Sequence, residues 1–376
     1  MQVPLTIGDF LYRAEHVYPD RTAFIDEPDQ PATPLGPWTY GELAAKARSQ
    51  AAFLDDLGVP VGGRVAVISQ NSARLLTSFF GVSAWGRVLV PVNFRLAVPE
   101  IQYIIGHSGA DVVYADPSLK DVLDQLDVSH KFLLGEDEHL FKDGVEPRPW
   151  ADPDENATAT INYTSGTTAR PKGVQLTHRN LWLNTTTFGL HTGVTDRDTY
   201  LHTLPMFHCN GWGMPYIQAA MGNTQVVLRQ VDGTEILHRI EKHGVTMLCG
   251  APAVINMVLD AAQMWNNPIP GRDRVRVVVA GAPPPTRTIA RVADELGWEF
   301  IQIYGLTETA PLLTINRSRT EWDDLDTLER AKRLSRAGAP AVGVRMQVDE
   351  EGEVQAQSNH ILAGYWEQPE ESAAAL

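Results

Sequence analysis

Residues 163–173 read Tyr-Thr-Ser-Gly-Thr-Thr-Ala-Arg-Pro-Lys-Gly, and they directly follow an apolar segment whose composition predicts a β-strand. Small residues let backbone N–H groups approach an anion closely, and Lys172 adds a mobile positive charge. The order differs from the Walker phosphate loop, in which Ser or Thr follows a Gly-Lys pair. A polar surface loop is the alternative, but the pattern favours a phosphate-binding loop of another kind. The residues expected to contact phosphate oxygens are Thr164, Ser165, Gly166, Thr167 and Thr168.

Short runs rich in Val and Ile alternate with helical patterns along most of the chain. This alternation predicts an α/β fold of layered βαβ subdomains with mostly parallel sheets. The predicted strands lie at residues 64–68, 88–92, 111–115, 158–163, 225–228, 245–248, 276–279 and 299–303. The clearest predicted helices lie at residues 40–57, 73–85 and 235–243.

The last part of the chain has a different pattern. A charged stretch, 317–336, is followed by short β segments with Gly and Pro turns instead of βα units. We therefore expect two divisions. Residues 1–336 form a large α/β body of two similar layered subdomains, and residues 337–376 form part of a small β subdomain.

Composition excludes several classes of function. The 376 residues include 31 Lys and Arg against 46 Asp and Glu, and this net charge of −15 argues against nucleic acid as a partner. Two cysteines are too few for a disulfide framework or a cysteine zinc site. No leader peptide and no window of about 20 apolar residues is visible. We therefore expect a cytoplasmic protein with at most peripheral membrane contact.

A second motif follows another predicted strand. Residues 302–309 read Gln-Ile-Tyr-Gly-Leu-Thr-Glu-Thr. An aromatic ring beside glycine can offer its face to a purine, and the Glu308 carboxylate is an oxygen ligand that suits Mg²⁺. Upstream, residues 280–284 read Ala-Gly-Ala-Pro-Pro at the end of a strand. For both segments, the alternative is an ordinary strand-to-turn connection.

A third motif, residues 204–213, reads Leu-Pro-Met-Phe-His-Cys-Asn-Gly-Trp-Gly. A lone His or Trp is often simply a packed core residue. Small residues here and further along the chain leave volume for an apolar chain or ring. Gly211, Gly250 and Ala251 are such small residues. The family resemblance described next implies that they bind the substrate together with His208, Trp212 and Gly305.

Together these motifs resemble the adenylate-forming superfamily, which includes acyl-CoA synthetases, luciferases and the adenylation domains of peptide synthetases. The phosphate loop departs from the family pattern only at Ala169, where Gly is usual, and the motifs follow family order from residues 39–43 to Tyr365. Family members that activate amino acids usually carry Asp where His208 stands, so a substrate with an α-amino group is disfavoured. The resemblance is to the acyl-CoA synthetase type, whose small β subdomain is a distorted barrel.

The resemblance also implies roles for single residues. Tyr304 would stack on adenine, and Thr307 would contact the AMP phosphate. Glu308, with Thr164 as a second contact, would hold Mg²⁺. The implied catalytic residues are Lys172, Thr307, Glu308 and His208, and the implied adenine-site residues are Gly281, Ala282, Gln302 and Tyr304.

The implied reaction joins a fatty or other apolar carboxylic acid to AMP from ATP, with CoA as the co-substrate of the full-length protein. Two alternatives stay open: an acyl-AMP ligase that loads a carrier protein, and a non-catalytic nucleotide- or lipid-binding module. A homodimer is also compatible with the sequence. The family's Thr-Gly-Asp motif and its C-terminal lid with a catalytic Lys do not occur in this sequence. We therefore expect an N-terminal domain that is weakly active at best alone.

Overall fold

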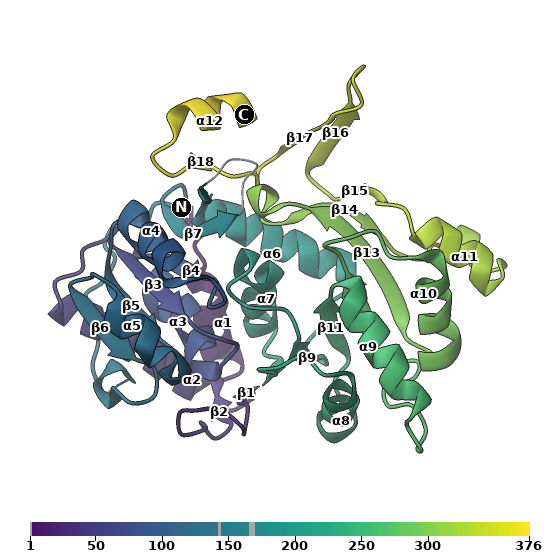
Figure 1. The fold of residues 1–376 in the computed structure, drawn as a ribbon, viewed down its shortest axis with the longest axis horizontal. Helices are drawn as coiled ribbons and strands as arrows, with labels where there is room; N and C mark the ends of the chain where they lie inside the picture. Colours follow the sequence, from purple (N-terminus) through teal and green to yellow (C-terminus); the bar gives the residue numbers. More distant parts are fainter. Residues whose placement is uncertain (1, 142–143, 165–169) are drawn as a thin grey trace.

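The structure is a computed structural model that describes residues 2–141, 144–164 and 170–376. Over these residues, most strands form two large sheets that lie side by side (Figure 1). Both sheets are mostly parallel, with antiparallel strands at their edges. The predicted α/β class with layered, mostly parallel sheets is therefore confirmed.

The first sheet has nine strands among the described residues, in the order β15-β14-β13-β12-β11-β9-β10-β1-β2. Its strands are β1 (Thr22–Ile25), β2 (Trp38–Thr39), β9 (Thr199–His202), β10 (Thr224–Val227), β11 (Met247–Gly250), β12 (Arg276–Val279), β13 (Glu299–Gly305), β14 (Leu312–Asn316) and β15 (Ala339–Pro340).

The second sheet has seven strands within the same described ranges, in the order β18-β8-β7-β4-β3-β5-β6. Its strands are β3 (Arg64–Ile68), β4 (Val88–Val92), β5 (Ala110–Ala115), β6 (His130–Leu133), β7 (Thr158–Thr164), β8 (Lys172–Thr177) and β18 (Gly364–Tyr365).

Helices cover these sheets and fill the space between them (Figure 1). Buried rings of Phe79 and Phe80 meet the ring of Tyr216, with centroids 5.8 and 5.7 Å apart, so helices α3 and α7 share one core. None of the helices in the described ranges is long and apolar enough to cross a membrane. The helices are α1 (Gly8–Val17), α2 (Tyr40–Asp56), α3 (Ala73–Ser83), α4 (Val98–Ser108), α5 (Lys120–Gln125), α6 (His178–Thr192), α7 (Met214–Ala220), α8 (Gly233–His243), α9 (Pro252–Gln263), α10 (Thr286–Arg291), α11 (Thr327–Leu334) and α12 (Pro369–Ala375).

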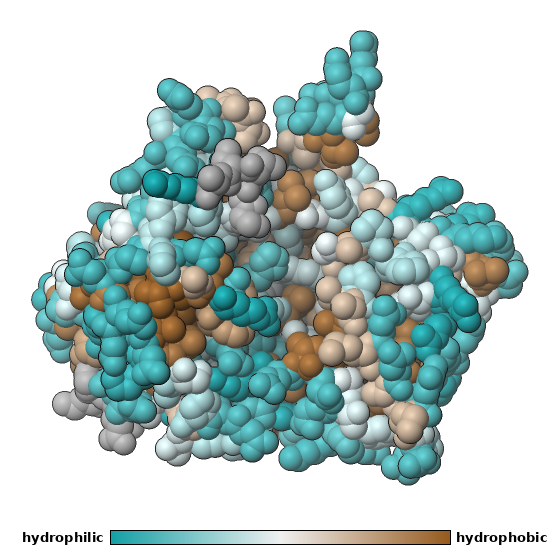
Figure 2. All heavy atoms as spheres, viewed as in Figure 1, coloured by the Kyte–Doolittle hydropathy of each residue, from teal (hydrophilic) through white to brown (hydrophobic). Residues whose placement is uncertain are grey.

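The region expected to form a small β subdomain is divided between three sheets. Strands β16 (Val344–Val348) and β17 (Val354–Ser358) form a two-stranded antiparallel sheet that points away from the body (Figure 1 and Figure 2). Strand β15 joins the first large sheet, and β18 joins the second. The described residues therefore form a small antiparallel sheet here, in place of the barrel that the resemblance implied.

A buried ion pair joins the two large sheets near the ends of their strands. Asp116 follows β5, and its carboxylate accepts two hydrogen bonds from Arg229, which follows β10, at 2.6 and 2.9 Å. The side chains are only 4% and 7% exposed. Burial alone would raise the pKa of Asp116, but hydrogen bonds from Arg229 and Ser118 outweigh it and hold the pKa below its usual value.

The ion pair gives the first prediction. Asp116→Asn should lower the free energy of unfolding by about 3 kcal/mol at neutral pH, because it leaves the Arg229 guanidinium buried without a charged partner. Since the folded-state pKa of Asp116 is depressed, its contribution is lost as the pH falls through that pKa. The difference in the free energy of unfolding between wild type and variant, measured by urea unfolding, should therefore decrease on acidification.

A control pair lies on the surface. Lys120 and Asp124 form an ion pair in which both side chains are 57% exposed, so Asp124→Asn should change stability far less than Asp116→Asn. If Asp116→Asn and Asp124→Asn lowered the free energy of unfolding equally, the buried pair would not hold the sheets together.

Candidate functional site

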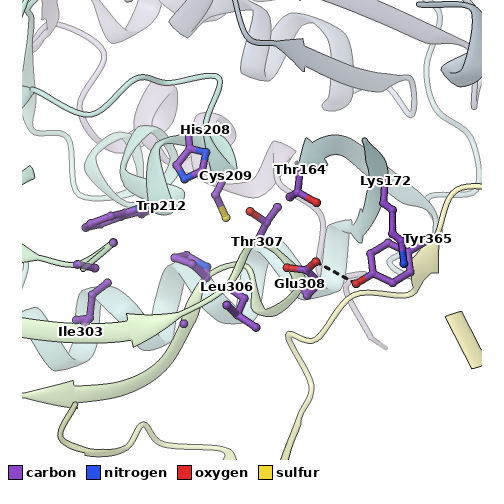
Figure 3. Close-up of a pocket in the computed structure, with 14 residues that line it drawn as sticks. Thr164, Lys172, His208, Cys209, Trp212, Ile303, Leu306, Thr307, Glu308 and Tyr365 are labelled. Carbon is purple, nitrogen blue, oxygen red and sulfur yellow. Dashed lines mark hydrogen bonds between the residues drawn. The ribbon is translucent and has the colours of Figure 1, made fainter. Parts of the chain in front are cut away.

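One cleft of about 470 Å³ lies between the ends of strands from both large sheets. Figure 3 shows the residues that line it. The lining residues are Thr164, Lys172, His208, Cys209, Trp212, Ala280, Gly281, Ile303, Gly305, Leu306, Thr307, Glu308, Pro311 and Tyr365. All three predicted motifs therefore meet at one place, although they lie far apart in the sequence.

Some predicted site residues are not part of the lining. Gln302 is buried in β13, and Tyr304 is half-buried in the same strand opposite Thr314 of β14. Gly250 ends β11, and Ala251 precedes α9. Gly211 and Ala282 are also outside the lining, while Ser165, Gly166, Thr167 and Thr168 lie outside the described residues.

The hairpin of β7 and β8 places the first two functional side chains. Its antiparallel register pairs Thr164, the last residue of β7, with Lys172, the first residue of β8. The next residue must be small, because a Cβ at Gly173 would approach Cγ2 of Ile161 to 2.9 Å. The hairpin thus presents a hydroxyl and an ammonium group side by side at the cleft (Figure 3).

The Glu308 carboxylate comes from a tight turn after β13 in the other sheet. Thr307–Thr309 form a short 3₁₀ helix, and the Thr309 hydroxyl accepts a hydrogen bond from Leu306 N–H at 2.9 Å and donates one to the Pro311 carbonyl at 2.6 Å. At Gly305, an added Cβ would lie 1.5 Å from that same carbonyl oxygen. The turn is therefore too closely packed to accept a side chain at this position.

Tyr365 of β18 links these two segments. Its hydroxyl donates a hydrogen bond to Oε1 of Glu308 at 3.0 Å, and Nζ of Lys172 lies 4.9 Å from its ring centroid (Figure 3). Burial, together with the nearby Glu308 carboxylate, raises the pKa of Tyr365 to about 12, so its hydroxyl keeps its proton at neutral pH. In the sequence, Tyr365 only closed the series of family motifs, and no role was predicted for its side chain.

His208 and Trp212 lie at the other end of the cleft (Figure 3). Burial lowers the pKa of His208, which favours a neutral imidazole. The next five residues, Cys209–Gly213, all have positive φ angles between 44° and 80°. Such a conformation costs about 1–3 kcal/mol for each non-glycine residue, so neighbouring groups must hold this left-handed turn in place.

The described lining of the cleft offers oxygen groups for a cation, but not a complete set of protein ligands. No cluster of three or more His, Cys, Asp or Glu residues that could hold a metal occurs among the described residues. Glu308 and Thr164 nevertheless line the same cleft. Mg²⁺ is usually bound by one or two carboxylates together with phosphate oxygens of a substrate, so these residues fit the expected role.

The chain is similar to known proteins in sequence and in fold. The sequence model of the AMP-binding enzyme family matches residues 11–366. The chain is 34% identical to 4-hydroxybutyrate–CoA ligase 2 of Metallosphaera sedula, over 98% of this chain and 71% of that protein. It is 31% identical to 2-methylpropanoate–CoA ligase CCL4 of Humulus lupulus, over 99% of this chain and 72% of that protein. The crystal structure of the N-terminal domain of FACL13 from Mycobacterium tuberculosis matches this fold with a TM-score of 0.85 and a sequence identity of 26%. The match covers 100% of this chain and 94% of that one.

The packing of the Glu308 turn gives the second prediction. Gly305→Ala should lower the free energy of unfolding by about 1–3 kcal/mol, because the new methyl group overlaps the Pro311 carbonyl and forces the turn to move. Chemical denaturation would measure the loss.

A glycine in open space provides the matched control. Gly106 lies in α4 with nothing within 4 Å of an added Cβ, so Gly106→Ala should stabilise the protein by about 0.5–1 kcal/mol. If Gly305→Ala also stabilised the protein, as Gly106→Ala is expected to do, the tight turn would not be constrained as described.

Proposed function

This chain belongs to the adenylate-forming superfamily of AMP-binding enzymes, and from that premise we propose that it activates a short carboxylic acid with ATP and that CoA then accepts the acyl group. One observation carries the proposal. Lys172 and Glu308, which come from different sheets, line a single cleft together with His208 and Trp212.

The end of the cleft near Lys172 fits the nucleotide. A carboxylate oxygen of the acid attacks the α-phosphorus of ATP, the bond from that phosphorus to the β-phosphate oxygen breaks, and pyrophosphate leaves with the electron pair. Lys172 and the hydroxyls of Thr164 and Thr307 stabilise the negative charge on the phosphate oxygens. Mg²⁺, held by Glu308 and Thr164, would neutralise part of the same charge.

We assign the adenine to the edge formed by residues 280–282 and β13. Gly281 lines the cleft and has a φ of 90°, so its backbone can adopt a close approach that a side chain would hinder. Ala282, Gln302 and Tyr304 follow from the family resemblance and stay proposals, as do the contacts of residues 165–168 with phosphate.

The opposite end of the cleft fits a small acid. Trp212 is only 6% exposed and lies at the end farthest from Lys172 (Figure 3). The whole cleft measures about 470 Å³ and must hold the nucleotide as well as the acid. Gly250 and Ala251, which were expected to widen the acyl site, do not line this cleft.

The two sequence relatives described above are named for short acids and for CoA. Their printed substrates are 4-hydroxybutyrate and 2-methylpropanoate, and both are named CoA ligases. We therefore favour CoA over a carrier protein. The products formed with CoA and with a carrier protein would distinguish a CoA ligase from an acyl-AMP ligase. ATP-dependent formation of a hydroxamate from a carboxylic acid would exclude a non-catalytic binding module.

The third prediction concerns the substrate. In a thermal-shift panel with ATP and Mg²⁺, butyrate, 4-hydroxybutyrate and 2-methylpropanoate should stabilise the protein, and octanoate and palmitate should not. A ligand at one hundred times its Kd adds about 2.7 kcal/mol to the free energy of unfolding, which is ample to detect. Selective stabilisation by palmitate would overturn the assignment to short acids, and hydroxamate formation with the same acids would identify which of them react.

The fourth prediction concerns the cation. Glu308→Gln keeps the shape of the side chain but removes its charge, so the additional stabilisation that Mg²⁺ gives in the presence of ATP should disappear. Glu351→Gln, on the exposed loop of the β16–β17 hairpin, is the matched control and should behave like wild type. An unchanged Mg²⁺ response in Glu308→Gln would remove this carboxylate from the metal site.

A further inference from the structure

Three buried polar side chains, from segments that also line the cleft, form a closed network. Thr160 and Asn162 belong to β7, and Asn210 belongs to the left-handed turn Cys209–Gly213. Thr160, Asn162 and Asn210 are 0%, 2% and 0% exposed. In such surroundings each polar atom needs a partner, because an unpaired buried donor or acceptor is costly.

The two amides satisfy each other. Nδ2 of Asn162 donates to Oδ1 of Asn210 at 3.1 Å, and Nδ2 of Asn210 donates to Oδ1 of Asn162 at 3.2 Å. Thr160 completes the network: its hydroxyl donates to Oδ1 of Asn162 at 2.9 Å and accepts from Nδ2 of Asn210 at 3.0 Å. An amide side chain carries both a donor and an acceptor, so each asparagine can donate to the other and accept from it.

The network joins the two ends of the cleft. Two residues beyond Asn162, β7 ends at Thr164, which lines the phosphate end. Asn210 lies between His208 and Trp212, which line the acid end. A shift of the turn relative to β7 would therefore move the acid-binding side chains relative to the phosphate-binding hydroxyl.

The strained backbone of the turn favours such a shift. Cys209, Asn210 and Trp212 have φ angles of 44°, 53° and 61°. Few residues other than Gly, Asn and Asp adopt this left-handed region without strain. Asparagine tolerates this region better than most residues, so Asn210 both adopts the strained conformation and fastens it. Without its hydrogen bonds, the turn can relax toward ordinary φ angles.

We propose that Asn162 and Asn210 are positioning residues. They hold the left-handed turn against β7, so that His208 and Trp212 contact the acid at a fixed position relative to the Thr164 hydroxyl. The role assigned to the acid rests on the proposed function, whereas the fastening of the turn does not. The pair acts through the turn and touches no substrate itself.

The two cysteines allow the fastening to be measured without any substrate. Cys209 lies on the turn and Cys249 lies in β11, and both are buried. In Asn210→Gly, which keeps the left-handed backbone accessible but removes the amide, a thiol reagent should label Cys209 about tenfold faster, with Cys249 unchanged. Asn162→Ala, which alters the other side of the pair, should give the same pattern.

A buried amide elsewhere is the matched control. Asn223 donates to Oε1 of Gln218 at 2.8 Å and does not line the cleft, so Asn223→Ala should leave the ratio of the two labelling rates as in wild type. Equal acceleration at Cys209 and Cys249 in the Asn210 and Asn162 variants, or no acceleration at either, would overturn the fastening role.

Kinetics then test the role in positioning. Asn210→Gly and Asn162→Ala should raise the KM for the acid about tenfold and leave the KM for ATP nearly unchanged, and the double variant should be no worse than either single one. Equal changes in both KM values would overturn the positioning of the acid. Absence of any acid-dependent signal in wild type would instead refute the proposed function, while the labelling result would still decide whether the turn is fastened.

Discussion

The hydrogen bond from Tyr365 to Glu308 is the interaction on which the cleft depends. Tyr365 belongs to a strand that pairs with β8, so it moves with the Lys172 hairpin of the seven-stranded sheet. Glu308 belongs to a turn that follows β13 of the nine-stranded sheet. The neighbouring backbone adds a second link, because Leu362 N–H donates to the Glu308 carbonyl at 2.7 Å. An anion site built from two sheets is thereby held in one arrangement.

The chemistry of the cleft follows from where each sheet ends. Parallel strands place their carboxyl ends along one edge, and loops at that edge carry the side chains that bind ligands. Cationic and hydroxyl groups gather near Lys172, whereas the neutral imidazole of His208 and the ring of Trp212 lie at the other end. A charged nucleotide and a small acid with an apolar body can therefore lie end to end.

Local patterns predicted the class of fold, since strands that alternate with helices form layered, mostly parallel sheets. The meeting of the motifs in one cleft was implied only by the family resemblance. Boundaries were less accurate. Helix α8 begins at Gly233 and not at residue 235, because the Asp232 side chain accepts a hydrogen bond from Glu235 N–H. The division of residues 337–376 between three sheets depends on long-range pairing, such as that of β18 with β8, which no local pattern encodes. The same holds for Tyr365 and for the Asn162–Asn210 pair, whose roles arise from contacts between distant segments.

The account can be tested most directly by a crystal structure of the protein with a non-hydrolysable analogue of butyryl-adenylate. It predicts the phosphate mimic between Lys172 and Glu308, with the butyryl group directed toward Trp212 and the Asn162–Asn210 hydrogen bonds retained. An analogue bound outside this cleft, or bound within it with its acyl group pointing away from Trp212, would contradict the account.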